Sequence, residues 1–208
     1  MKNRINLKRF GWTVFAIFII GIAAAFNASA GLGNGTVGVF YDGIRCVMNL
    51  EPEQLGTAAN VVNVLMIILL AVVERHYVNL GTILYMLQYG ICVNLGTFLY
   101  SKIFVSDALV VRIFASGIGC FLLFAGIAIY VVTDIGLEPT TGLTLVIREK
   151  LGCEYKQAKW NFDGLSKVIG FLCGGKVGAI TVINLIIGGP IIQWMIGKAR
   201  ILLKDITE

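Results

Sequence analysis

The chain has 208 residues, of which 57% are hydrophobic and 14% are charged. Soluble domains average about 25% charged residues, so this composition excludes a disordered chain and an ordinary soluble enzyme and indicates an integral membrane protein. The formal net charge is +5, but the sequence has no basic stripe interleaved with aromatic residues. We therefore expect no nucleic-acid partner and expect contact with anionic membrane lipid instead.

Apolar runs divide the chain into membrane-spanning lengths. Because a span needs about 20 apolar residues, we predict an all-α polytopic protein with about six transmembrane helices in a single membrane domain, 1–208. In chain order, the predicted spans are 10–30, 58–73, 77–100, 110–132, 160–174 and 177–196. Two segments, 37–50 and 142–150, are too short to span, so they either re-enter the membrane or lie on its surface. The first run ends in Ala28-Ser29-Ala30, as a signal peptide does, but its length favours a span.

The two halves of the sequence resemble each other. The matches are Gly21-Ile22-Ala23 with Gly126-Ile127-Ala128, Glu51 and Gln54 with Glu154 and Gln157, Thr82 with Thr181, and Gly90 with Gly189. Their order is the same in both halves, which predicts a first repeat over 10–100 and a second over 108–197. Each repeat holds three predicted spans, and an odd number gives the two repeats opposite orientations in the membrane.

Basic residues predict the orientation of the chain. With the N-terminus in the cytoplasm, the outer segments carry only Arg45, Lys102, Arg112 and Lys176, while Lys167 lies inside a span. The other lysines and arginines then all fall on the cytoplasmic side. The positive-inside rule therefore favours a multi-pass protein with both termini in the cytoplasm.

Two Gly-Leu loops, 31–36 and 136–141, occupy matching positions in the repeats. Inverted repeats with short or interrupted segments are typical of secondary transporters, which bind their solute near the midplane. We expect these loops and the polar residues facing them to bind a small solute. The candidate solute-binding residues are Asn34, Thr36, Pro139, Thr140, Thr141, Thr82, Thr181 and Asn60. The alternative is that the loops lie at the surface and the polar side chains only hydrogen-bond neighbouring helices.

Asp163 and Lys167 lie four residues apart in the fifth predicted span, so they share one helix face. An ionisable residue inside a span is costly and usually faces a cavity or a partner. We predict Asp163 as an ion- or proton-coupling residue with Lys167 as its counter-charge; alternatively, the pair is purely structural. The five cysteines form no CxxC pair and no catalytic motif occurs. We therefore expect no enzyme activity, no cofactor and no metal site.

Four short motifs resemble those of the YczE/YyaS/YitT group of bacterial membrane proteins. They are Gly31-Leu-Gly-Asn-Gly-Thr36, Asn79-Leu-Gly-Thr-Ile83, Asp134-Ile-Gly-Leu-Glu-Pro-Thr-Thr141 and Gly188-Gly-Pro190. The likeness covers about residues 10–197 and implies a transporter of the bacterial cytoplasmic membrane. Members of the group often carry Pro-Trp-Asp after the Gly-Leu pair. This chain has Asn34-Gly35-Thr36 and Pro139-Thr140-Thr141 there, so a role attached to that aspartate is not carried over.

Two functions compete. The first is a secondary transporter of a small solute, proton-coupled through Asp163. The alternative is a substrate-binding or accessory membrane subunit, similar to the six-span component of energy-coupling-factor vitamin transporters. In that alternative the small-residue run Gly21 to Ala25 packs against a helix of a partner subunit or of a second copy. An internal inverted repeat favours the transporter, whereas co-purification with an ATPase module would favour the alternative.

Overall fold

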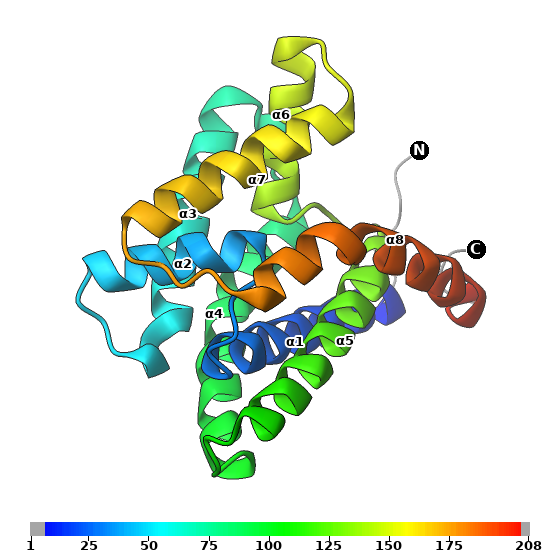
Figure 1. The fold of residues 1–208 in the computed structure, drawn as a ribbon. Coiled ribbons are helices and arrows are strands. Elements are labelled where there is room, and N and C mark those ends of the chain that lie inside the picture. The colour runs from blue at the N-terminus through cyan, green and yellow to red at the C-terminus, as the bar shows by residue number, and fades with distance from the viewer. Residues whose placement is uncertain (1–6, 205–208) are drawn as a thin grey trace.

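The computed structural model describes residues 7–204, without the side chains of Thr36, Tyr155, Lys156 and Leu185. Within that range the chain is helical and contains no strand, which confirms the predicted all-α class. Figure 1 shows the helices, which are α1 (Leu7–Ser29), α2 (Thr36–Val47), η1 (Pro52–Gln54), α3 (Leu55–Val73), η2 (Arg75–Tyr77), α4 (Leu80–Ile103), α5 (Leu109–Thr133), α6 (Pro139–Leu151), α7 (Tyr155–Leu172) and α8 (Ala179–Leu202). Each predicted span and each predicted short segment is a helix.

Four helical segments in the described part of the chain are long and apolar enough to cross a membrane: Leu7–Ser29, Pro52–Val73, Leu80–Ile103 and Leu109–Thr133. Large apolar side chains stand exposed on them, as on α3, where Leu65, Leu69 and Val72 are more than half exposed. A helix with such an outer face needs an apolar solvent. The protein is therefore a membrane-type helical protein.

The helices form two groups of four. In the first group, α4, α1, α5 and α8 pack side by side in a row; in the second, α2, α3, α6 and α7 close into a ring. Figure 1 shows α6 and α7 on one side of α1 and α5. The two groups meet mainly where α3 packs on α4.

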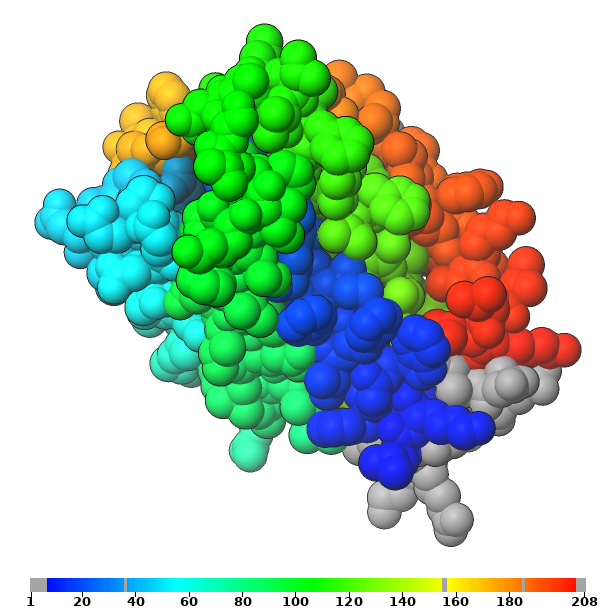
Figure 2. Space-filling view, turned by 90° about the horizontal axis from the view of Figure 1, so that it is seen from below, coloured from blue at the N-terminus to red at the C-terminus, as the bar shows by residue number. Residues whose placement is uncertain are grey.

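Helix α1 packs at the centre of the row, between α4 and α5. A methyl group added to Gly21 would lie 2.5 Å from Cβ of Cys92, and one added to Gly96 would lie 2.7 Å from Cβ of Ala25. Small residues thus let α1 and α4 approach closely, as in other membrane helix pairs. Figure 2 shows α1 in blue beside the green ends of α4 and α5. The run Gly21 to Ala25 is consequently used within this chain and does not support docking of a partner helix.

Helix contacts in the first half recur in the second half. α1 packs on α4 as α5 packs on α8, α2 on α3 as α6 on α7, and α2 on α7 as α6 on α3. The matched residues also play matched roles at helix starts. The backbone N–H of Glu51 donates to Gln54 Oε1 at 3.1 Å, and that of Glu154 donates to Gln157 Oε1 at 3.2 Å. The sequence matches thus coincide with corresponding local structure.

One contact lacks its counterpart. α3 packs tightly on α4, where a methyl group on Gly56 or Gly90 would overlap the backbone oxygen of the other. Asn60 Oδ1 accepts a hydrogen bond from the Gly90 N–H at 3.0 Å and Asn94 Oδ1 accepts one from the Gly56 N–H at 2.8 Å. In the described part of the chain α7 and α8 do not pack together in this way, and a methyl group on Gly189 would meet nothing within 4 Å.

The C-terminal end of α6 is held at the connection between α3 and α4. Lys150 Nζ lies 3.2 Å from Glu74 Oε1, and the Tyr77 hydroxyl donates a hydrogen bond to Glu149. This bond to a carboxylate, with a smaller contribution from burial, raises the pKa of Tyr77 from 10.0 to about 12. The neutral phenol is therefore favoured in the folded protein.

Tyr77→Phe is expected to lower thermal stability at neutral pH. Because the folded-state pKa is raised, the contribution of Tyr77 is fully present below pH 10.0 and is lost as the pH rises towards about 12. Melting temperatures of the wild type and the variant should therefore converge over that interval. A difference between wild type and variant that does not change with pH would contradict this role.

Candidate functional site

The two Gly-Leu loops are each held by the last helix of the other half. At the first loop, the Ile180 N–H at the start of α8 donates to the Leu32 carbonyl at 3.0 Å. Gly33 has a φ of 112°, and a methyl group on it would lie 2.6 Å from the Gly178 nitrogen. Only glycine combines this backbone conformation with so close an approach.

At the second loop, the Thr82 hydroxyl at the start of α4 donates to the Leu137 carbonyl at 2.7 Å. A methyl group on Gly81 would lie 2.9 Å from the Gly136 Cα. Thr82 is fully buried, and Thr181, its match in α8, is almost so; Thr181 Oγ1 accepts a hydrogen bond from the Gly178 N–H at 3.3 Å. Both threonines thus lie at contacts between a Gly-Leu loop of one half and the last helix of the other half.

The predicted solute-binding residues fall into separate places. Thr82 lies with loop 136–141 and Thr181 with loop 31–36, whereas Asn60 lies in the contact between α3 and α4. Asn34 is buried and its Nδ2 donates to the Gly38 carbonyl at 3.5 Å, within its own half. The side chain of Thr36 lies outside the described residues. Pro139, Thr140 and Thr141 form the first turn of α6, in which Pro139 and Thr140 are buried.

Four buried tyrosines from α2, α4 and α5 pack on one another. Their ring centroids form a chain: Tyr41 to Tyr89 at 5.9 Å, Tyr89 to Tyr85 at 4.9 Å, and Tyr85 to Tyr130 at 5.9 Å. The half-buried Glu138, the residue just before α6, is close enough to act electrostatically on all four hydroxyls. We call Tyr41, Tyr85, Tyr89, Tyr130 and Glu138 the tyrosine–glutamate cluster. It lies where the row of helices meets the ring, with residues from α2, α4, α5 and the start of α6.

Hydrogen bonds order this cluster but leave some of its polar atoms without partners. The hydroxyls of Thr140 and Thr141 both donate to Glu138 Oε1 at 2.9 Å. The Tyr41 hydroxyl donates to Oδ1 of the fully buried Asn63 at 2.8 Å. Asn63 Nδ2 and the Tyr130 hydroxyl, in contrast, are buried and have no hydrogen-bond partner. Such atoms are costly unless something satisfies them, so they mark a place where a polar ligand gains hydrogen bonds.

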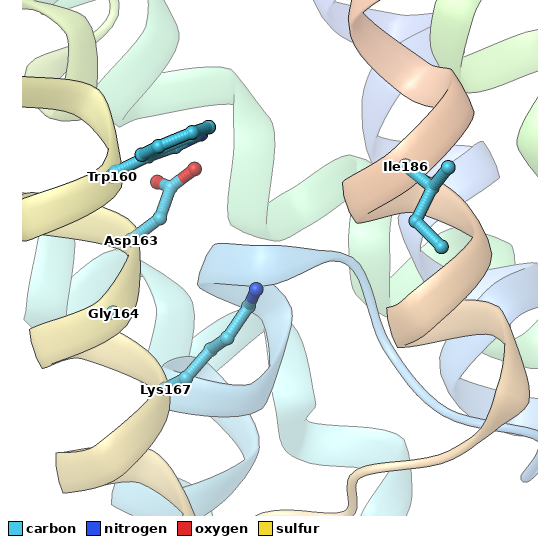
Figure 3. A pocket seen from close by; sticks show the side chains of 5 residues that line it. All are labelled: Trp160, Asp163, Gly164, Lys167 and Ile186. Atoms are coloured by element: carbon cyan, nitrogen blue, oxygen red, sulfur yellow. The ribbon is translucent and has the colours of Figure 1, made fainter. Parts of the chain in front are cut away.

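A pocket of about 470 Å³ opens between α7 and α8, lined by Trp160, Asp163, Gly164, Lys167 and Ile186. Figure 3 shows Asp163 and Lys167 projecting from α7, with Ile186 of α8 on the opposite side. Asp163 is 6% exposed, and its Oδ1 lies 3.0 Å from Lys159 Nζ. The structure therefore pairs Asp163 with Lys159, one turn earlier, and places Lys167 in the same pocket without an ion pair to Asp163 among the described residues.

The sequence pointed to Thr140, Thr141 and Asp163 but not to the tyrosines or to Glu138. Tyr85 and Tyr89 lie one turn apart on one face of α4, which is a usable signal. Tyr41 and Tyr130 are far from them in the chain and look like ordinary apolar-run residues. Only the tertiary contacts among α2, α4 and α5 bring the four rings together.

Comparisons with known proteins identify a family and two relatives. A family model described as a family of unknown function (DUF6198) matches residues 7–197. "Uncharacterized protein YyaS" of Bacillus subtilis (strain 168) is 23% identical over 177 residues, which cover 85% of this chain and 87% of that protein. An uncharacterized protein of Haemophilus influenzae is 24% identical over 183 residues, covering 88% and 81%. No solved structure matches. The predicted resemblance to a YyaS-like group is thus confirmed.

Proposed function

The chain belongs to the DUF6198 family, and on that premise we propose that it is a secondary transporter of a small solute, built from two inverted repeats. The proposal gives it six spans, α1, α3, α4, α5, α7 and α8, in a bacterial cytoplasmic membrane, with both termini in the cytoplasm. The repeats are 10–100 and 108–197, and α2 and α6 are short helices between spans. The tyrosine–glutamate cluster and the adjoining Thr140 and Thr141 form the solute site between the repeats.

The observation that carries this proposal is the unequal packing of matched helices. α3 and α4 are in contact along Gly56 and Gly90, whereas α7 and α8 flank an open pocket. Alternating access in inverted repeats works by two related halves that exchange conformations about a fixed site. A structure with one half closed and the other open is the arrangement that this mechanism requires.

The reciprocal loop contacts suit such an exchange. Each Gly-Leu loop is held by the first turn of the last helix of the opposite half, through Leu32 and Ile180 or through Leu137 and Thr82. Movement of α8 or α4 is therefore transmitted to the loop that precedes α2 or α6. Because α6 carries Glu138 at its start, closure of one half acts directly on the solute site.

The transporter proposal is tested with the full chain reconstituted in lipid vesicles. The vesicles are loaded with a defined mixture of small amines, amino acids, sugars and carboxylates, and mass spectrometry follows their loss relative to protein-free vesicles. We expect saturable loss of one class of solute. Retention of every component, together with co-purification of an ATPase module from membranes, would favour the substrate-binding subunit instead.

Asp163→Asn is expected to abolish proton-coupled movement of the solute while the protein stays folded. The substitution removes a buried charge whose partner is Lys159, yet keeps the size of the side chain. Proton flux is followed with a pH-sensitive dye inside the vesicles. Asp107→Asn, an exposed acid between α4 and α5, is the control and should behave as wild type. Wild-type proton flux in Asp163→Asn would remove Asp163 from coupling.

A further inference from the structure

The tyrosine–glutamate cluster has a chemistry that restricts its ligand. We infer that this site binds a small organic cation with an ammonium group, held by the Glu138 carboxylate and the tyrosine rings; the inference rests on the proposed function and names its substrate class. Three observations carry it: the ion-pair state of Glu138, the aromatic surroundings, and the buried polar atoms without partners.

The first observation is that the Glu138 side chain lacks a basic partner among the described residues. None of the ion pairs in the described part of the chain includes Glu138. The charged side chain that acts on the hydroxyls of all four tyrosines is Glu138, and no described basic side chain acts on them. A half-buried carboxylate without a basic partner attracts a positively charged donor, so the site favours a ligand of positive charge.

The Glu138 carboxylate is oriented by hydrogen bonds that the described residues donate to only one of its two oxygens. Both threonine hydroxyls donate to Oε1, and the Glu138 side chain makes no capping hydrogen bond to the backbone of α6. The positive end of the α6 dipole favours a negative charge at this position. Oε2 accepts no hydrogen bond from the described residues, so it can receive an N–H group or the positive charge of a ligand.

The tyrosines add a second means of binding a cation. The face of an aromatic ring attracts a positive charge within about 6 Å of its centre, and aromatic cages are a common way to recognise ammonium groups. Four rings here adjoin one another at centroid distances of 4.9 to 5.9 Å. A carboxylate beside such rings suits a soft organic cation better than an inorganic one. The described residues, moreover, offer no group of three or more His, Cys, Asp or Glu side chains for a metal ion.

The unpartnered atoms suit the rest of such a ligand. The Tyr130 hydroxyl both donates and accepts, and Asn63 Nδ2 donates. A hydroxyl or carbonyl group on an amine would satisfy one of these two atoms, which lie at opposite ends of the chain of rings. The carboxylate, the aromatic rings and the unpartnered polar atoms together favour an amino alcohol or a similar amine over a simple alkylammonium ion.

The experiment measures binding to the purified full chain by calorimetry and thermal shift. The probes are ethanolamine, dimethylethanolamine and choline, with 3,3-dimethylbutan-1-ol as the neutral analogue that has the shape of choline. We expect at least one of the three amines to bind saturably and raise the melting temperature, and the neutral alcohol to do neither. Absence of binding by all three amines, or equal binding of the neutral alcohol, would overturn the inference.

Two variants place the ligand. Glu138→Gln keeps an oxygen that accepts from Thr140 and Thr141 but removes the charge, and it should weaken amine binding roughly tenfold or more. Asp134→Asn is the matched control, because Asp134 is an exposed acid in the same loop and its φ of 50° is one that asparagine tolerates. Unchanged binding in a folded Glu138→Gln would overturn the assignment.

The vesicle assay separates this inference from the proposed function. Amine binding without movement of any solute would leave the binding site standing and refute transport. Movement of a sugar or carboxylate without amine binding would leave transport standing and refute the cation site.

Discussion

Gly90→Val is expected to prevent the protein from folding stably. A side chain at Gly90 would overlap Asn60 and the Gly56 carbonyl, and the Gly90 N–H would lose its bond to Asn60 Oδ1 as α4 moved away. Overpacking of a tight contact costs about 1–3 kcal/mol or more. Here α3 and α4 would have to separate along their length, so we expect an effect at the upper end of that range, about 3 kcal/mol. The measurement is the yield of monodisperse protein and its melting temperature.

The matched control is the same substitution at Gly117, on α5, where a new side chain would meet nothing within 4 Å. Gly117→Val should express and melt like the wild type. If Gly90→Val did so as well, the close contact between α3 and α4 would not be a feature of the folded protein.

Gly189→Val is expected to leave stability unchanged and to abolish transport. Gly189 matches Gly90 in the sequence, but a methyl group on it would meet nothing within 4 Å. If α7 and α8 close on each other as α3 and α4 do, a valine at position 189 would clash with α7. This clash would match the one between α3 and a valine at position 90. The variant would be held with α7 and α8 apart, so binding would persist while movement across the membrane stopped.

Vesicle transport and ligand binding are compared for Gly189→Val and for Gly197→Val, which lies on the same helix in open surroundings. Gly197→Val should transport normally. Wild-type transport by Gly189→Val would show that α7 and α8 do not close on each other, and the proposed exchange between the halves would then fail.

Most of the fold could be predicted from the sequence because apolar runs and their interruptions are local signals. Every predicted segment is a helix, and the boundaries differ only by a few residues. α4, for example, begins at Leu80 rather than at 77 because Asn79 and Thr82 cap it, with Asn79 N 3.5 Å from Thr82 Oγ1. The spacing of Glu51 and Gln54 likewise indicated a helix start that the structure shows.

The site could be predicted only in part. A lone ionisable residue in an apolar run, such as Asp163, is visible in the sequence because burial of a charge is unusual. The partner of Asp163 could not be identified from the sequence, because Lys159 and Lys167 are both four residues away from it. Only the packing of α7 favours Lys159. Glu138 reads as an ordinary loop acid before a proline. Its importance comes from Tyr41, Tyr85 and Tyr130, which lie on three other helices within range of its electrostatic effect.

Each half of the chain binds the Gly-Leu loop of the other half, and this has a consequence for biosynthesis. As the chain leaves the ribosome, Thr82 emerges 55 residues before Leu137, whose carbonyl it binds. The interval is longer for Leu32, because its carbonyl binds the N–H of Ile180 at the start of α8. The first four helices therefore enter the membrane before Leu137 is available to Thr82 and before Ile180 is available to the Leu32 carbonyl, and they reach their final packing only when the second half inserts. A chain cut between α4 and α5 should accordingly assemble only when both pieces are made in the same cell.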